Sequence, residues 1–331
     1  MEKKYNWGII APGSIARKFA SDLKLLPQAS LYAVGSRSIE RAREFAEHFG
    51  FKKFYGSYEE LAADPEIDVV YIASPHVRHY ADSLLCMKNN KAVLCEKPVA
   101  MNSPQFRIMV DTARENRVFF MEALWTRFIP SFKKSLELIK DGAIGEIKII
   151  KSDFCFNAPF DRNGRLFNPL LGGGSLLDIG IYPVFLALEF AGLPSKIHAM
   201  AALDDSGIDM SCSILFSHSN NVLSVLFSSL VNNGRTETVI HGSKGTVRIN
   251  REWHIPTSLD LIPDNKEMIH FDFDENGYGY QYEAEEVMKC LEEGKTESDI
   301  FSLQKSSQLI ETLDKIREIT GINYPKELES C

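Results

Sequence analysis

A carboxylate, an ammonium group and a proline follow a short apolar stretch in the segment KAVLCEKPVAMN, residues 91–102. The apolar stretch, 92–95, is typical of a buried strand, and Glu96, Lys97 and Pro98 come directly after it. Burying a charge is costly unless the charge is paired or used. Two charges and a residue that cannot donate a backbone hydrogen bond raise the question whether this strand end serves chemistry; taken alone, Lys97 would be explained as an ordinary surface lysine at a strand end.

A second candidate lies near the start of the chain, in NWGIIAPGSIARKFA, residues 6–20. Ala11, Gly13 and Ala16 stand where the glycines of a G-x-G-x-x-G/A turn would lie, between a predicted strand and a predicted helix. Such a turn brings backbone and helix N–H groups to a pyrophosphate. Ala11 departs from the pattern, so the strand–turn–helix context carries the prediction. The expected cofactor contacts are Ala11, Gly13, Ser14 and Ile15.

The end of the second predicted strand distinguishes between two cofactors. An acidic residue there would bind the ribose 2′-hydroxyl of NAD. The sequence instead has Ser36, Arg37 and Ser38, with Arg41 one turn further on. Positive charge and hydroxyl donors suit a 2′-phosphate, so we expect NADP, with NAD less favoured. The alternative is that both arginines are solvated residues at the start of a helix.

Three further segments, taken together with the turn in residues 6–20 and the strand end CEKP (95–98), resemble a known family. They are ASPHVRHY (73–80), MEALWTRFIP (121–130) and GGGSLLDIGIYP (172–183). The whole set resembles the Gfo/Idh/MocA oxidoreductases. Within that family it is most similar to the branch of dimeric dihydrodiol dehydrogenases and NADP-dependent D-xylose 1-dehydrogenases. The resemblance covers nearly the whole chain.

The resemblance implies roles for the residues of the first part of the chain. Lys97 is similar to the active-site lysine of the family, and Pro98 often follows it through a cis bond. Glu96 resembles a carboxylate near the nicotinamide ribose. The family's P-x-x-x-H motif is matched on the cofactor side, where we expect contacts from Ser74, Pro75, His76 and His79. His76 stands where asparagine is common, and His79 has the alternative role of a helix histidine whose hydrogen bonds are satisfied.

The same resemblance places Asp178 and Tyr182 on the family's D-x-x-x-H motif, with tyrosine replacing histidine. Oxidation of an alcohol by a nicotinamide needs a base for the hydroxyl proton. A free tyrosine titrates near about pH 10, and a lysine ammonium nearby would stabilise the tyrosinate. We expect Tyr182 as acid/base, Lys97 as electrostatic tuner and hydroxyl donor, and Asp178 as orienting group, with Lys97 and Tyr182 meeting beside the nicotinamide.

Alternatives to these roles stay open. Lys97 could carry the proton itself. Asp178 could only cap a helix, since 175–178 fits S-x-x-D, and Tyr182 could be core packing. Pro183 leaves the helical register of Asp178 and Tyr182 undecided. Four further residues are candidates for the substrate pocket, although core or interface packing explains aromatic residues equally well: Trp125, Arg127, Phe154 and Arg165.

The elements that position these residues form two domains. Apolar strands alternate with helices up to about residue 123, which predicts a doubly wound parallel Rossmann sheet that binds NAD(P) over 1–123. Longer strands joined by hairpin-like turns follow, which predicts an α+β domain with a large open, mostly antiparallel sheet over 124–331. The resemblance implies that this second domain binds substrate and forms a homodimer through its sheet.

Composition sets limits on partners and location. The chain of 331 residues has a net charge of −8, which argues against a nucleic acid as binding partner. Its six cysteines form no CxxC pair, and we expect no metal site. We see no apolar core of a signal peptide and no apolar run long enough to span a bilayer, so we expect a cytoplasmic protein without a membrane partner.

The sequence thus predicts an NADP-dependent oxidoreductase that transfers a hydride between nicotinamide and a hydroxyl-bearing carbon of a sugar or cyclic trans-diol. One alternative is an NAD-linked inositol or sugar dehydrogenase or reductase of the same family. The other is a non-catalytic NADP-binding regulatory protein.

Overall fold

The computed structural model describes residues 3–273 and 276–331. Its contacts divide the described chain into two compact units. The first unit comprises residues 3–125, 276–307 and 330–331, and the second comprises 126–273 and 308–329.

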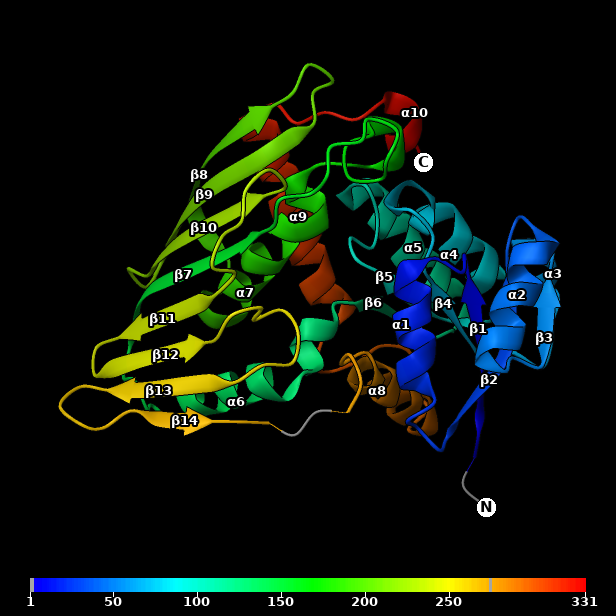
Figure 1. Cartoon of the computed structure of the whole chain (residues 1–331), viewed down its shortest axis with the longest axis horizontal. Helices are drawn as coiled ribbons and strands as arrows, with labels where there is room; N and C mark the ends of the chain where they lie inside the picture. Colours follow the sequence, from blue (N-terminus) through cyan, green and yellow to red (C-terminus); the bar gives the residue numbers. More distant parts are fainter. Residues whose placement is uncertain (1–2, 274–275) are drawn as a thin grey trace. The chain divides into compact units, whose positions relative to one another are not determined.

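The first unit is built on a sheet of six strands in the order β3-β2-β1-β4-β5-β6, and every neighbouring pair is parallel (Figure 1). This order is that of a doubly wound nucleotide-binding fold, so the predicted Rossmann sheet is confirmed. The strands are β1 (Tyr5–Ile10), β2 (Ala29–Gly35), β3 (Lys53–Tyr55), β4 (Val69–Ile72), β5 (Ala92–Glu96) and β6 (Phe120–Ala123). The helices are α1 (Ser14–Leu23), α2 (Ile39–Phe49), α3 (Tyr58–Ala63), α4 (His79–Lys88), α5 (Ser103–Asn116) and α8 (Gln281–Glu292).

The central strands are mostly apolar because helices cover both faces of a parallel sheet. Every residue of β4, β5 and β6 is buried, including Glu96 and Glu122. The same strands end at one edge of the sheet, which is where ligands bind in open α/β sheets.

Helix α8 belongs to the first unit although it comes late in the chain. Asp22 of α1 accepts hydrogen bonds from the backbone N–H groups of Tyr278 and Tyr280, at 2.9 and 2.8 Å. The amide of Phe120 donates to the carbonyl of Thr296 at 3.0 Å. A single division between residues 123 and 124 therefore does not describe the compact units, because these contacts bind the segment before α8 to α1 and the segment after it to β6.

The second unit contains a sheet of eight strands in the order β14-β13-β12-β11-β7-β10-β9-β8. Its neighbours are antiparallel except for β7 and β10, so the predicted mostly antiparallel sheet is confirmed. The strands are β7 (Ile147–Cys155), β8 (Pro194–Leu203), β9 (Asp209–His218), β10 (Leu223–Ser229), β11 (Thr238–Gly242), β12 (Gly245–Ile249), β13 (Leu259–Pro263) and β14 (Ile269–Phe271).

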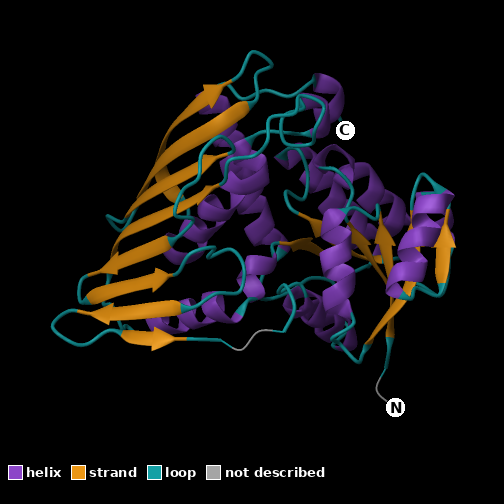
Figure 2. Cartoon of the chain, viewed as in Figure 1, coloured by secondary structure: helices purple, strands orange, loops and turns teal. Residues whose placement is uncertain are grey.

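One face of this sheet carries the helices of the second unit. Helix α6 (Pro130–Lys140) contacts β12, and α7 (Ile181–Ala191) contacts β7 and β10 (Figure 2). Two further helices follow, α9 (Leu303–Thr320), whose residues up to Ser307 belong to the first unit, and α10 (Lys326–Glu329). The alternate residues of β9 and β10 that face the helices are buried, for example Phe216 and Leu226, while Leu215 and Val225 are exposed on the other face.

One segment, Pro169–Ala191, is long and apolar enough to cross a membrane by length and composition, with a hydropathy of 1.6 over its most apolar window. This corrects the expectation that the chain has no such run. Because 89% of that window is buried inside the fold, the segment is explained as part of the core of the second unit.

Candidate functional site

The turn after β1 has the geometry of a dinucleotide loop. Ala11 adopts a positive φ of 65°, a conformation that favours glycine, and its carbonyl accepts the N–H of Gly13 at 2.7 Å. Gly13 is the N-cap of α1 and has no side chain to occupy the helix N–H groups, and the first turn of α1 has no acidic residue. Ser14 and Ile15 begin the helix. These amides can hold a pyrophosphate, so the residues present fit the cofactor that the fold implies.

The segment after β2 is polar and partly exposed. Arg37 and Arg41 are exposed, and no carboxylate lies at the tip of the strand. Ser36 accepts the N–H of Ser38 at 3.2 Å. The hydroxyl of Ser38 caps α2 by accepting the N–H of Arg41 at 3.3 Å and donates to Glu40 at 2.8 Å, so its hydrogen is already engaged.

His79 joins two loops at the sheet edge instead of facing solvent. It is fully buried, and its ring nitrogens lie 2.8 Å from the carbonyl oxygens of Ser74 and Pro98. Burial lowers the pKa of His79, and the two carbonyl contacts oppose that shift. This geometry fits the alternative of a histidine satisfied within the fold, acting on the site by holding its loops. Ser74 and His76 are also buried, and the His76 ring lies 5.8 Å from that of His79.

The strand end that carries Lys97 is held by carboxylates. Glu96 accepts a hydrogen bond from the hydroxyl of Tyr71 and another from the backbone N–H of Lys97, the latter at 3.2 Å. The Lys97–Pro98 bond is cis. Glu122, at the end of β6, accepts the N–H of Val99 at 3.0 Å. Sequence reasoning missed Glu122, although a carboxylate at the end of an apolar strand is the same signal that singled out Glu96.

In the second unit, a buried carboxylate holds the segment before Tyr182. Asp209 accepts the hydroxyl of Ser175 and the N–H of Leu176, each at 2.7 Å, and burial raises the pKa of Asp209 to about 6. Gly174 has a φ of 115°, and a Cβ there would lie 2.3 Å from Asp209, so only glycine fits. The hydroxyl of Tyr324 donates to the carbonyl of Gly173 at 2.7 Å.

Asp178 and Tyr182 do not share one continuous α-helix. Asp178 lies in a π-helical turn, η4 (Leu176–Gly180), and Tyr182 lies in the first turn of α7. Pro183 lacks the N–H that an α-helix would direct at the carbonyl of Ile179, and this suits a wider turn before it. The register of Asp178 and Tyr182, which the sequence left undecided, is therefore not that of a regular α-helix.

Arg165 pairs with Asp178. Its guanidinium donates to both carboxylate oxygens, at 2.8 and 3.3 Å, from the loop between β7 and η4. The side chain of Arg165 is 47% exposed while that of Asp178 is 6% exposed. Asp178 is thus held by an ion pair, and Arg165, which we expected to line the pocket, also positions the aspartate.

Tyr182 is enclosed by aromatic rings of its own unit. Its ring centroid lies 5.4 Å from that of Phe154, 5.6 Å from that of His254 and 6.4 Å from that of Trp253. Phe154 and His254 stack at 3.9 Å. Trp253 and His254 were not predicted, although two adjacent ring residues in a loop between strands were a visible signal.

The two remaining pocket candidates have structural contacts. Trp125 stacks on Tyr280 at 4.2 Å with an interplanar angle of 7°. Arg127 forms an ion pair with Glu189 at 2.8 Å, and both side chains are largely buried. These contacts fit the packing alternative for Trp125 and a structural ion pair for Arg127. Across residues 3–273 and 276–331, no group of three or more His, Cys, Asp or Glu side chains could hold a metal ion.

Comparison with known proteins identifies the family. Residues 5–124 match the model described as oxidoreductase family, NAD-binding Rossmann fold, and residues 132–248 match the GFO/IDH/MocA C-terminal domain. Curated relatives cover almost the whole chain. A trans-1,2-dihydrobenzene-1,2-diol dehydrogenase of Xenopus laevis is 38% identical, covering 96% of this chain and 99% of that protein. The enzyme of the same name from Mus musculus is 37% identical, with 97% and 98% covered.

Solved structures share the fold at lower identity. KijD10, a 3-ketoreductase from Actinomadura kijaniata solved with NADP and TDP-benzene, has a TM-score of 0.86 at 23% identity, with 96% of this chain and 98% of that chain covered. Levoglucosan dehydrogenase in complex with NADH has a TM-score of 0.87 at 20% identity, with 98% and 100% covered.

The chain belongs to the Gfo/Idh/MocA oxidoreductase family. It is an NAD(P)-dependent oxidoreductase that acts on CH–OH groups. This sets aside the alternative of a non-catalytic regulatory protein.

Proposed function

We propose that the chain is an NADP-dependent dehydrogenase of a cyclic trans-diol or a sugar. The carbon that bears the hydroxyl loses a hydride, the hydroxyl proton passes to a base of the protein, and a carbonyl group forms. When NADP is bound, its nicotinamide supplies the hydride acceptor. Relatives named trans-1,2-dihydrobenzene-1,2-diol dehydrogenases, 34–38% identical over almost the whole chain, support this substrate class.

The aromatic surroundings of Tyr182 carry the proposal. Phe154 and His254 lie tilted against the phenol ring, at interplanar angles of 53° and 59°, and the buried ring of Trp253 meets it at 90°. Aromatic surroundings of this kind suit the C–H face of a sugar or an unsaturated six-membered ring, and they exclude water from a proton transfer. The geometry thus favours a cyclic substrate over a short acyclic alcohol.

The acid–base roles are part of the proposal. Tyr182 takes the hydroxyl proton, Lys97 supplies the positive charge that favours the tyrosinate, and Asp178 orients groups near Tyr182. Arg165 neutralises Asp178, so the carboxylate acts mainly as an anchor for the loop and the π-helical turn. Proton transfer by Lys97 itself is the alternative, and kinetics of Tyr182→Phe separate the two.

We propose NADP over NAD because Arg37 and Arg41 offer positive charge at the end of β2. The 2′-phosphate would be bound by guanidinium groups, with the Ser36 hydroxyl beside them. NAD is the second candidate. The observation that favours it is Glu40 in the first turn of α2, which accepts the Ser38 hydroxyl and places a negative charge near this position.

We also propose a homodimer that forms through the open face of the eight-stranded sheet. Cross-strand partners on that face form one row across the sheet: His198, Leu215, Val225, Lys151, Val239, Arg248, Asp260 and His270. Leu215 and Val225 are 52% and 45% exposed, and Met200 beside them is 80% exposed. A second copy would cover this apolar part.

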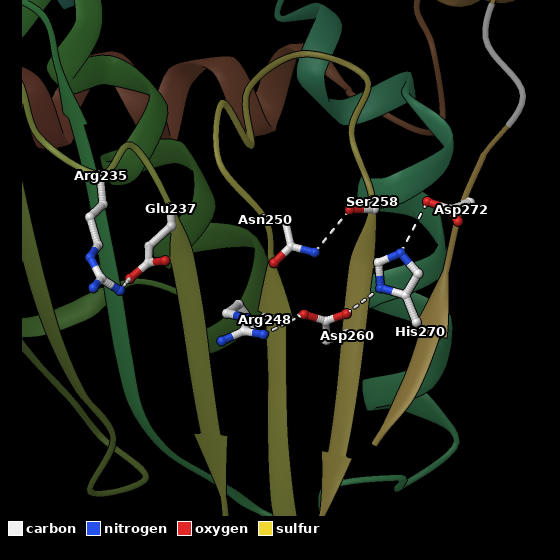
Figure 3. A network of polar contacts seen from close by, with 8 residues as sticks. All are labelled: Arg235, Glu237, Arg248, Asn250, Ser258, Asp260, His270 and Asp272. Carbon is white, nitrogen blue, oxygen red and sulfur yellow. Dashed lines mark hydrogen bonds and ion pairs between the residues drawn. The ribbon is translucent and has the colours of Figure 1, made fainter. Parts of the chain in front are cut away.

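The other end of the row is polar and internally paired. Asp260 binds the guanidinium of Arg248 at 2.6 Å and also the ring of His270, which in turn contacts Asp272 (Figure 3). Figure 3 shows two more pairs just beyond the ends of neighbouring strands, Arg235 with Glu237 and Asn250 with Ser258. Because these charges are already satisfied, the apolar part of the row is the part that gains from a partner.

A cytoplasmic location stays a prediction.

The proposed activity is tested by absorbance at 340 nm with NADP or NAD and a panel of trans-dihydrodiols, aldoses and inositols. We expect reduction of NADP with cyclic diols or sugars and a much smaller rate with NAD. A faster rate with NAD, or turnover only with acyclic alcohols, would contradict the proposal.

A further inference from the structure

The turn after β5 has two backbone amides that the sheet cannot satisfy. Lys97 and Val99 each have an N–H group, and Pro98 between them has none. The carboxylate of Glu96 accepts the N–H of Lys97 at 3.2 Å, and the carboxylate of Glu122 accepts the N–H of Val99 at 3.0 Å. The carbonyl of Pro98 faces His79 at 2.8 Å. The turn that carries Lys97 is thus fixed on both sides of the proline by glutamate side chains.

Glu122 reaches this turn because of strand register. Strands β5 and β6 are parallel, and Glu122 is the partner of Cys95, two residues before Lys97. Glu122 is only 2% exposed. Burying a carboxyl group is costly, and an uncharged residue would fill a strand end more cheaply. The hydrogen bond from the Val99 amide is the stabilising interaction that offsets this cost.

We propose that Glu122 is a positioning residue for Lys97, holding the Val99 amide so that the turn presents the Lys97 side chain in one direction. This inference rests on the proposed function, in which Lys97 serves the chemistry. Glu122 acts through the backbone and needs no contact with substrate or cofactor.

The position of Glu122 also makes its charge depend on pH. Burial raises the pKa of Glu122 to about 7; Ser306 and the Val99 amide oppose the rise, Glu96 adds to it and Lys97 opposes it. These are the polar groups that face it from α9, the turn and β5. An ionised carboxylate binds an amide more strongly than a protonated one. The turn should therefore tighten as pH rises through about 7.

Two substitutions test this. Glu122→Gln keeps an oxygen acceptor but cannot ionise, whereas Glu122→Ala removes the acceptor. We expect Glu122→Ala to lower kcat roughly tenfold or more while the Kd for NADP changes by less than about threefold. Glu122→Gln should retain most of kcat and lose an inflection near pH 7 that the wild type shows. Glu47→Gln, an exposed glutamate on α2, is the matched control and should match the wild type.

A folded Glu122→Ala protein with wild-type kcat, or a Glu122→Gln protein as impaired as Glu122→Ala, would overturn the inference. A readout independent of turnover covers the case in which the alanine variant does not fold. Lysines are reductively methylated with 13C, and the Lys97 signal is assigned by its loss in Lys97→Met. We expect this signal to shift near pH 7 in the wild type but not in Glu122→Gln. Equal titration in both would refute the role of Glu122, whereas an inert wild type would refute only the proposed activity.

Discussion

The guanidinium group of Arg165 donates hydrogen bonds to both carboxylate oxygens of Asp178, at 2.8 and 3.3 Å. This pair connects an irregular loop to the π-helical turn that precedes Tyr182. A residue expected to line the pocket and one expected to orient the base thus act as a unit. The loop and the acid/base residue should respond together to changes at either position.

Arg165→Met should therefore lower kcat/KM about tenfold, because it removes two charge-assisted hydrogen bonds to a buried carboxylate. Arg165→Lys should recover only part of the loss, since an ammonium cannot reproduce a two-oxygen contact. Steady-state kinetics check both. Arg162→Met, in the same loop, is the control, and an equal effect of Arg162→Met and Arg165→Met would contradict the role given to the pair.

Arg37→Ala and Arg41→Ala should each weaken NADPH binding by roughly 10- to 100-fold and leave NADH binding nearly unchanged. The physical reason is that the extra phosphate is the only group that distinguishes the two cofactors. Cofactor fluorescence titration measures the Kd values, and added salt should weaken NADPH more than NADH. Arg43→Ala, an exposed arginine of the same helix, serves as control. Equal losses of affinity for NADPH and NADH would contradict a contact between these arginines and the 2′-phosphate.

Glu283 should make the first unit less stable as pH rises. The side chain is fully buried, neither carboxyl oxygen has a hydrogen-bond partner in the described part of the chain, and burial, with Glu96 and Asp22 adding, raises its pKa well above 4.5. The folded state keeps a proton that the unfolded state releases. The free energy of unfolding should then fall by up to about 1.4 kcal/mol per pH unit above the unfolded pKa, until the folded pKa is reached.

Urea unfolding from about pH 5 to about pH 8, above the ordinary pKa of a glutamate, measures this slope. Glu283→Gln should reduce the decline by that amount, and exposed Glu285→Gln on the same helix should not. If the free energy of unfolding of the wild type rose across this range, and Glu283→Gln showed the same pH dependence, Glu283 would be ionised in the folded state and the prediction would be wrong.

Disruption of the open sheet face should separate the proposed dimer. Light scattering at micromolar concentration should give twice the chain mass of 37.3 kDa for the wild type. Leu215→Asp combined with Val225→Asp should give the single mass, because two buried charges would oppose association. Leu25→Asp, an exposed leucine of the first unit, is the control. A monomeric wild type, or a dimer that survives the double substitution, would contradict the proposal.

The architecture was predictable because alternating apolar strands and helices dictate a parallel sheet, and longer strands with hairpin turns dictate an antiparallel one. The place of α8 was not predictable, because it depends on Asp22 accepting amides 256 and 258 residues further along. Sequence distance carries no signal for such a contact.

The candidate site also has features that local sequence predicts and features that depend on residues distant in the sequence. Local signals identified the loop at Gly13 and the strand end at Lys97, since a turn and a strand terminus leave a pattern in adjacent residues. The surroundings of Tyr182 depend on Trp253 and His254, which come from a distant loop. The π-helical turn before Pro183 arises from a missing amide, and the sequence allowed more than one register there.

The most direct test of the central claim is single-turnover formation of NADPH, with a substrate carrying deuterium at the hydroxyl-bearing carbon. We expect the wild type to show a primary isotope effect. Tyr182→Phe and Lys97→Met should each form NADPH at least about 100-fold more slowly while binding NADP normally, because proton removal is worth roughly 100- to 10,000-fold. Tyr278→Phe and Lys88→Met, at surface positions, should match the wild type. Wild-type rates in both Tyr182→Phe and Lys97→Met would contradict the account.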